Sequence, residues 1–170
     1  FFFKQKTAYE IVDCDWSSDV CSSDLIALRL GSAVSPAQAA ALTDTAAAAL
    51  VDALALSVEI VDSRWSPDAE PGAPLQLADF QVHGALVLGP WLDWAAHGAG
   101  RDWSAQRGWQ QIGDAAPRAF AGSHPLGDPL WGLRPWLQHL CRDGDTVPAG
   151  TVVTTGSWSG CLPVARGQTL

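Results

Sequence analysis

Apolar and polar residues change rhythm several times along the chain, and each rhythm predicts an element. The segment IALRLG at 26–31 alternates apolar with other residues and ends in glycine, which predicts a β-strand. The β-branched run LSVEIVDSRW at 56–65 and the apolar run GALVLG at 84–89 predict two further strands. Residues 101–123 alternate loosely, as expected of a hairpin. The stretch TVPAGTVVTTGSW at 146–158 is expected to end as a strand and a glycine turn.

Two alanine-rich segments predict helices between the first two strands. SPAQAAAL offers Ser35 as an N-cap and Pro36 at the first helical position. TDTAAAALVDALA at 43–55 follows as a strong helix former, with Thr43 or Asp44 as its cap.

A third helix is expected in DPLWGLRPWLQHLCRDG at 128–144, where leucines recur at helical spacing and Pro135 kinks or delays the helix. The proline-rich segment at 65–76 predicts a loop, and LADFQVH at 77–83 a short turn or helix before its strand. Several strands with two or three helices predict an α+β fold. The sequence holds no GxGxxG or GxSxG motif, which argues against a doubly wound α/β fold.

Composition separates residues 1–25 from the rest of the chain. The only lysines, Lys4 and Lys6, and the only tyrosine, Tyr9, lie there. Translated backwards, KQKTAYEI and CDWSSDVCSSDL spell the two constant parts of a short-read sequencing adapter. We interpret residues 1–25 as an adapter-derived artefact without structure; a biological leader is the alternative. Residues 26–170 are then expected to be one incomplete domain, cut at both sides.

Charge and cysteine content narrow the class of protein. The chain carries a net charge of −8, of which residues 1–25 contribute −3 and the remainder −5. An acidic domain with scattered arginines argues against a nucleic-acid backbone as partner, and no basic amphipathic helix suggests a membrane surface. Cys141 and Cys161 show no CxxC spacing, so a zinc site is not expected. Two scattered cysteines fit a reducing cytoplasm.

Eight of the nine tryptophans lie in residues 26–170. They can stack on sugars or bases in a non-catalytic binding domain, or they can pack the core and interfaces. Their spread along the chain favours packing.

Glu59 carries the clearest chemical signal, because it lies between Val58 and Ile60 in an apolar run. A carboxylate there is costly unless it is paired, hydrogen-bonded or bound to a metal. A strand period of two puts Asp62 and Arg64 on the opposite face, where they can pair with each other. A glutamate on the solvent face of a strand explains the pattern equally well.

Four motifs occur in order: VEIVDSRW at 58–65, LADFQVHGALVLG at 77–89, HPLGDPLW at 124–131 and VPAGTVVTTGSWSG at 147–160. In order and spacing they resemble the 2-keto-4-pentenoate hydratases, which belong to the fumarylacetoacetate hydrolase superfamily together with the 4-oxalocrotonate decarboxylases. The resemblance covers residues 26–170. It implies a partial mixed β-roll with flanking helices, and a homo-oligomer when complete.

The resemblance also implies a metal site. The family holds Mg²⁺ or Mn²⁺ with three carboxylates, and by resemblance Glu59 is one of them. The other two, a Glu-x-Glu pair, should end immediately before Ile26, where this chain has Leu25. The family's catalytic Lys and Asp also belong upstream of the fragment, so the catalytic residues of this chain are unknown.

For substrate binding, the resemblance implies Thr155 and Gly156, for which a plain strand-ending turn is the alternative. It also points to His83, for which a structural role is the alternative. The three remaining histidines are interpreted as surface or packing residues: His97, His124 and His139.

The implied activity is a lyase reaction of aromatic catabolism. Water adds to 2-hydroxypenta-2,4-dienoate, a small 2-keto acid in its enol form, and gives 4-hydroxy-2-oxopentanoate. A 4-oxalocrotonate-type decarboxylase or a fumarylacetoacetate/acylpyruvate-type C–C hydrolase is the alternative. The truncated chain itself is expected to be inactive.

Overall fold

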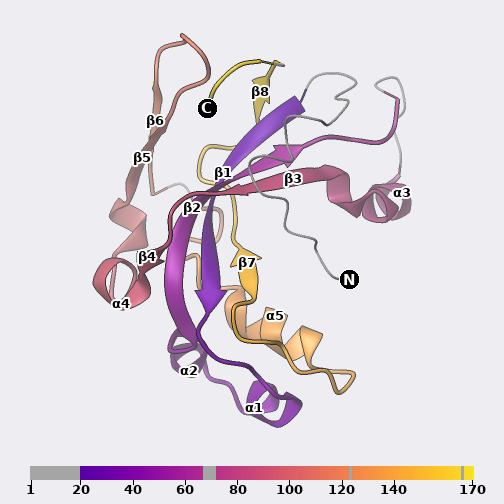
Figure 1. The fold of residues 1–170 in the computed structure, drawn as a ribbon, viewed down its shortest axis with the longest axis vertical. Helices are drawn as coiled ribbons and strands as arrows, with labels where there is room; N and C mark the ends of the chain where they lie inside the picture. The colour runs from indigo at the N-terminus through magenta and orange to yellow at the C-terminus, as the bar shows by residue number, and fades with distance from the viewer. Residues whose placement is uncertain (1–19, 67–71, 123, 166) are drawn as a thin grey trace.

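A curled antiparallel sheet with helices at its ends organises the structure, a computed structural model that describes residues 20–66, 72–122, 124–165 and 167–170. The sheet order is β3-β2-β1-β7, with β4 also pairing β2 and β8 also pairing β1 (Figure 1). The expected α+β class is confirmed.

The two long strands β1 (Val20–Leu30) and β2 (Val51–Val61) form the middle of the sheet. They pair antiparallel from Cys21 opposite Val61 to Leu30 opposite Val51. On its other edge β1 pairs with β7 (Val152–Thr154) and β8 (Leu162–Val164). The strand predicted at 26–31 is therefore present, and it begins further upstream than expected.

Residues 20–25 lie in β1, although the sequence interpretation gave residues 1–25 no structure. The physical reason is that ladder hydrogen bonds use backbone groups only, and unpaired backbone groups along β2 are costly where water is excluded. The ladder along β2 therefore continues through residues 21–25. The adapter origin of residues 1–25 stays a prediction, and residues 1–19 lie outside the described part.

The first predicted helix is confirmed as α1 (Pro36–Ala40), with a capping box between Ser35 and Gln38. The second helix is much shorter than predicted: α2 (Asp44–Ala48) is capped by the Thr43 hydroxyl, and β2 begins three residues after it.

The prediction of helix at 51–55 is wrong because pairing partners outweigh helix propensity there. Ala53, Leu54 and Ala55 are all buried, and Ala53 and Ala55 stand opposite residues of β1. A helix at these positions would leave the β1 ladder without a partner.

Downstream of β2 lie α3 (Ala73–Ala78), the short 3-10 turn η2 (Phe80–Val82), β3 (His83–Leu88) and β4 (Leu92–Asp93). The end of the loop predicted at 65–76 is thus helical. The next elements are α4 (Trp94–His97), η3 (Trp103–Ala105) and the predicted hairpin, β5 (Arg107–Gln110) with β6 (Arg118–Ala121). The hairpin is a separate two-stranded sheet.

The last helix, α5 (Leu133–Leu140), begins two residues before Pro135. A proline in the first turn costs no intrahelical hydrogen bond, because the first N–H groups of a helix have no partner inside it. α5 lies against α1 and α2 at one end of the sheet (Figure 1).

The core joins the inner part of the sheet to these helices. Leu28, Leu30 and Leu137 are fully buried at its centre. The buried rings of Trp94 and Trp103 stack at 6.3 Å between centroids, and Trp158 follows at 6.2 Å from Trp103. These three tryptophans are part of the buried core.

We expect Leu137→Ala to lower the free energy of unfolding by about 2–5 kcal/mol, because it leaves a cavity at the α5 contact with the sheet. Leu140→Ala in the same helix is the matched control, since Leu140 is 40% exposed and Leu137 is 0% exposed. Urea unfolding followed by circular dichroism measures both. Equal losses in the two variants would contradict this account of the core.

Candidate functional site

Glu59 and His83 face each other on neighbouring strands. Their side chains meet at 2.7 Å between Glu59 Oε1 and His83 Nδ1, and both are partly exposed. The structure thus brings together the predicted metal ligand and one predicted substrate-binding residue.

A β-bulge between β2 and β3 brings these two side chains together. In the β2–β3 ladder Ile60 stands opposite Ala85, but Val61 stands opposite His83, so Gly84 is an extra residue. In regular pairing His83 would lie on the other face of the sheet, because side chains alternate along a strand. The bulge moves the His83 side chain to the face of Glu59. No pattern in the sequence located this bulge.

Asp79 anchors the chain just before His83. Its carboxylate is almost fully buried, with Oδ1 accepting from Arg64 Nη1 at 2.8 Å and Oδ2 accepting from the Ser63 hydroxyl at 3.0 Å and the Arg64 backbone N–H at 3.1 Å. Arg64 Nη2 also donates to the His83 carbonyl at 2.9 Å. The Arg64 guanidinium holds the pKa of Asp79 below its usual value.

The predicted pairing of Asp62 with Arg64 is therefore wrong: Arg64 pairs with Asp79. Burial raises the pKa of Asp62, with the nearby Arg64 charge opposing that shift. Asp79 was missed because its partner is 15 positions away and no local pattern joins them. A polar aspartate inside LADFQVHG was the available signal.

Between Asp79 and His83 the backbone is left-handed at three successive residues, with φ of 53° at Phe80, 54° at Gln81 and 61° at Val82. Such angles are strained for a β-branched residue such as Val82. The Asp79–Arg64 network on one side and the β2–β3 ladder on the other hold this turn in place.

The positions expected to hold the other two carboxylates lie on β1, next to Glu59. Position 23 stands directly opposite Glu59, and Leu25 stands opposite Ser57 on the same face. Leu25 is buried and its carbonyl accepts from the Ser57 hydroxyl at 3.3 Å.

The residues present do not fit a three-carboxylate metal centre. Mg²⁺ binds through several oxygen ligands, whereas Glu59 has His83 as its only side-chain hydrogen-bond partner in the described residues. The described ranges contain no group of three or more His, Cys, Asp or Glu that could hold a metal ion.

Thr155 and Gly156 lie on the other edge of β1, away from β2. The Thr155 N–H and hydroxyl both donate to the Ile26 carbonyl at 3.0 Å. Gly156 lies against Pro125 and His124. The structure therefore does not bring these two predicted substrate-binding residues into contact with the Glu59–His83 pair.

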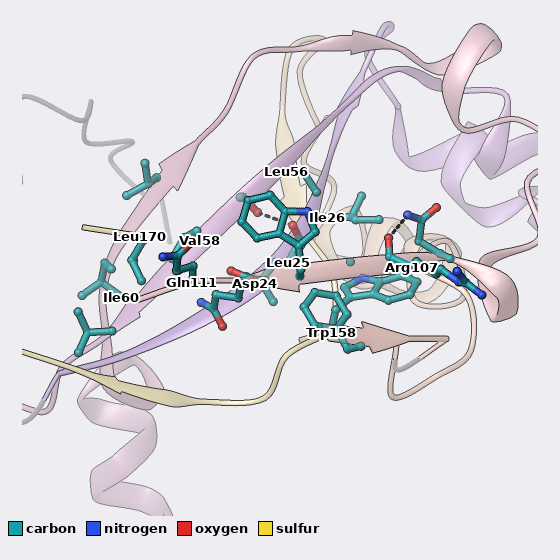
Figure 2. Close-up of a pocket in the computed structure, with 18 of the residues that line it drawn as sticks. Asp24, Leu25, Ile26, Leu56, Val58, Ile60, Arg107, Gln111, Trp158 and Leu170 are labelled. Carbon is teal, nitrogen blue, oxygen red and sulfur yellow. Dashed lines mark hydrogen bonds between the residues drawn. The ribbon is translucent and has the colours of Figure 1, made fainter. Parts of the chain in front are cut away.

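Two pockets lie near the predicted site residues. An open groove of about 1590 Å³ runs between one face of β1–β2 and the β5–β6 hairpin, and Figure 2 shows Ile26, Leu56 and Val58 along it. Glu59 and His83 do not line this groove. A smaller cavity of about 230 Å³ is lined by Thr155, Gly156 and His124, among others.

The fold is shared with solved enzymes. A 4-oxalocrotonate decarboxylase from Pseudomonas putida G7, complexed with magnesium and adipate, matches with a TM-score of 0.69 and 21% identity over 88% of this chain and 54% of its own. A maleylpyruvate hydrolase from Sphingobium sp. SYK-6 matches with a TM-score of 0.56 and 14% identity over 88% of this chain and 48% of its own.

A 5-carboxymethyl-2-hydroxymuconate delta-isomerase from Mycobacterium smegmatis matches with a TM-score of 0.56 and 17% identity over 97% of this chain and 55% of its own. The chain thus spans about half the length of these structures. Comparisons with protein-family models and with curated proteins gave no match. At such identities the likeness establishes the fold.

In the part of the chain that the structure describes, no helix has the length and apolar character needed to span a membrane.

We expect Asp79→Asn to destabilise the fold at pH 7, because it removes the charge that Arg64 pairs with in a buried place. A carboxyl with a depressed folded pKa stabilises above its unfolded pKa and loses that contribution as pH falls. The difference from the native chain should therefore shrink below about pH 4. Urea midpoints between pH 3 and 7 measure it, with Asp143→Asn, whose side chain is 71% exposed, as control. A difference that grows on acidification would refute the role of Asp79.

Proposed function

We propose that residues 26–170 are part of a divalent-metal-dependent enzyme that acts on small 2-keto acids. Its reaction is the hydration of 2-hydroxypenta-2,4-dienoate to 4-hydroxy-2-oxopentanoate. The observation that carries the proposal is Glu59, which stands across from the β1 positions where the family resemblance expects two more carboxylates. The fold match to an enzyme complexed with magnesium and adipate supports it.

In this proposal Glu59 is one ligand of Mg²⁺ or Mn²⁺ in the complete protein, and His83 is its neighbour. Metal ligands are commonly oriented by a hydrogen bond from a second group. The bulge at Gly84 and the Asp79–Arg64 pair hold His83 in that place. The complete enzyme is proposed to be a cytoplasmic homo-oligomer, with no nucleic acid or membrane as partner.

Decarboxylation of a 4-oxalocrotonate-type substrate is a second candidate. The specific observation that favours it is the fold match to 4-oxalocrotonate decarboxylase. C–C hydrolysis of an acylpyruvate is the third, supported by the match to maleylpyruvate hydrolase. Release of carbon dioxide would indicate decarboxylation, and formation of pyruvate together with a shorter acid would indicate C–C hydrolysis. Hydration gives neither product.

The complete gene product, supplied with Mg²⁺, is expected to consume the dienol absorbance of 2-hydroxypenta-2,4-dienoate. Glu59→Gln should lower the turnover at least about a hundredfold, the loss typical of an altered metal site. Asp52→Asn on the same strand is the matched control, because its pair with Arg29 is a surface ion pair. Unchanged dienol absorbance in the native protein would overturn the hydratase proposal.

The chain of 170 residues is expected to bind Mg²⁺ or Mn²⁺ weakly and to turn over nothing, because it holds one of three carboxylates. Isothermal titration of each metal into the native chain and Glu59→Ala measures this. For a non-catalytic binding domain, Glu59→Ala in the complete protein would instead leave Mg²⁺ binding unchanged. Activity of this chain equal to that of the complete enzyme would refute the assignment of the missing ligands.

A further inference from the structure

The two edges of the main sheet differ in length and composition. At one edge stand the three-residue strands β7 and β8, and β8 contains Pro163. At the other edge stands β3, which is six residues long and has the sequence HGALVL. Native proteins protect a sheet edge with short strands, charged residues or proline. The β7–β8 edge is protected in this way, whereas β3 has neither a proline nor a charged residue after His83.

One row of backbone groups on β3 pairs with β2. The Gly89 N–H donates to the Leu56 carbonyl at 2.9 Å, and the register continues regularly from there to Ala85. Hydrogen-bonded and non-bonded pairs alternate along an antiparallel ladder. The N–H and C=O groups of Gly89, Val87 and Ala85 therefore point toward β2.

The other row of backbone groups on β3 points away from the sheet. It consists of the N–H and C=O groups of Leu86 and Leu88, which alternate with the inward row. Within the residues that the structure describes, none of these groups takes part in a hydrogen bond. Leu86, Val87 and Leu88 are all partly exposed. This edge of the sheet can therefore accept a further strand through its main chain.

The open part of this edge is bounded at both ends. At its start, Arg64 Nη2 donates to the His83 carbonyl at 2.9 Å, and Gly84 is the extra residue of the bulge. Beyond its end follows Pro90, which has no N–H to offer to a ladder. Regular pairing is thus limited to residues 85–88, and a partner strand has to match this short segment.

A second copy of this chain offers a complementary strand. With the two β3 strands antiparallel and Val87 on the two-fold axis, Leu86 of each copy stands opposite Leu88 of the other. The outward N–H and C=O groups of Leu86 then meet those of Leu88 in hydrogen-bonded pairs. The side chains that face each other in this register are all apolar. Residues 84–89 carry no charge, so the net charge of −8 brings no like charges together at this contact.

Pairing through one shared edge ends with two copies. A two-fold contact uses the same surface on both partners, and the short strands and Pro163 protect the opposite edge of the sheet. The product is therefore a dimer and not a growing sheet. Because the ladder is one short strand long, the contact area is small for a protein interface. The expected dissociation constant is about 10–100 μM.

We propose that the edge of β3 pairs antiparallel with β3 of a second copy of this chain, with Val87 on the two-fold axis. The main sheets of the two copies then form one continuous sheet. Leu86 stands opposite Glu59 in the β2–β3 ladder, so the pairs of Leu86 with Leu88 lie on the sheet face of the Glu59–His83 pair. The proposal goes beyond the proposed function, because the contact needs neither metal nor substrate.

Sedimentation velocity of the full chain in EDTA, from about 5 μM to about 500 μM, measures the association. We expect the mass to rise from 18.0 kDa toward twice that value. Amide hydrogen exchange at the same concentrations locates the contact. The Leu86 and Leu88 amides should exchange about three- to tenfold more slowly in the concentrated sample, whereas the Val87 amide, which is bonded to β2 in both states, should not change.

Charge substitutions at the axis test the register. Val87→Lys and Val87→Glu each place two like charges against each other and should weaken the association at least about tenfold. An equimolar mixture of the two variants should form a dimer again, because opposite charges then face each other. Thr154→Lys and Thr154→Glu are the matched controls, since Thr154 is an exposed residue of the β7 edge. Both should associate as the native chain does.

A mass that stays at 18.0 kDa over the whole range would overturn the proposal. A dimer in which Leu86 and Leu88 exchange as fast as in the dilute sample would do so as well, and so would a mixture of folded Val87 variants that stays monomeric. The native chain decides alone if these variants do not fold, as judged by circular dichroism. Glu59→Gln should associate as the native chain does, so failure of the hydratase or metal tests leaves this result intact, and failure here leaves those tests intact.

Discussion

Pairing between β1 and β2 is the constraint on which the rest of the structure depends. Ten successive residues of β1, from Cys21 to Leu30, have partners in β2, and the opposite edge of β1 carries both β7 and β8. Removal of this strand would separate the Glu59 side of the sheet from the Thr155 side. The register of the pairing also fixes which β1 positions stand next to Glu59.

β1 also separates the candidate site residues into two groups, one on each side of the strand. On the β2 side, Glu59 meets His83 through a bulge. On the β7 side, Thr155 and Gly156 lie with His124 around a small, partly open cavity. The single strand β1 thus separates the Glu59–His83 pair from the small cavity that His124 lines.

Sequence reasoning succeeded where a signal is local. The strands around Glu59 and GALVLG, the Ser35 cap and the 107–121 hairpin all follow from patterns within a few residues. It failed at 51–55, where alanine and leucine favour a helix but long-range pairing decides. Asp79 stayed unseen for a related reason: its partner, Arg64, is distant in sequence.

The extra residue at Gly84 has a consequence for how this region can vary. Loss of Gly84 would make the ladder regular and still leave His83 opposite Val61, on the face of Glu59. Pairing of Gly84 itself with Val61 would instead move His83 to the other face of the sheet and take it away from the Glu59 carboxylate. The contact between the two side chains therefore depends on one residue of β3 staying out of the ladder.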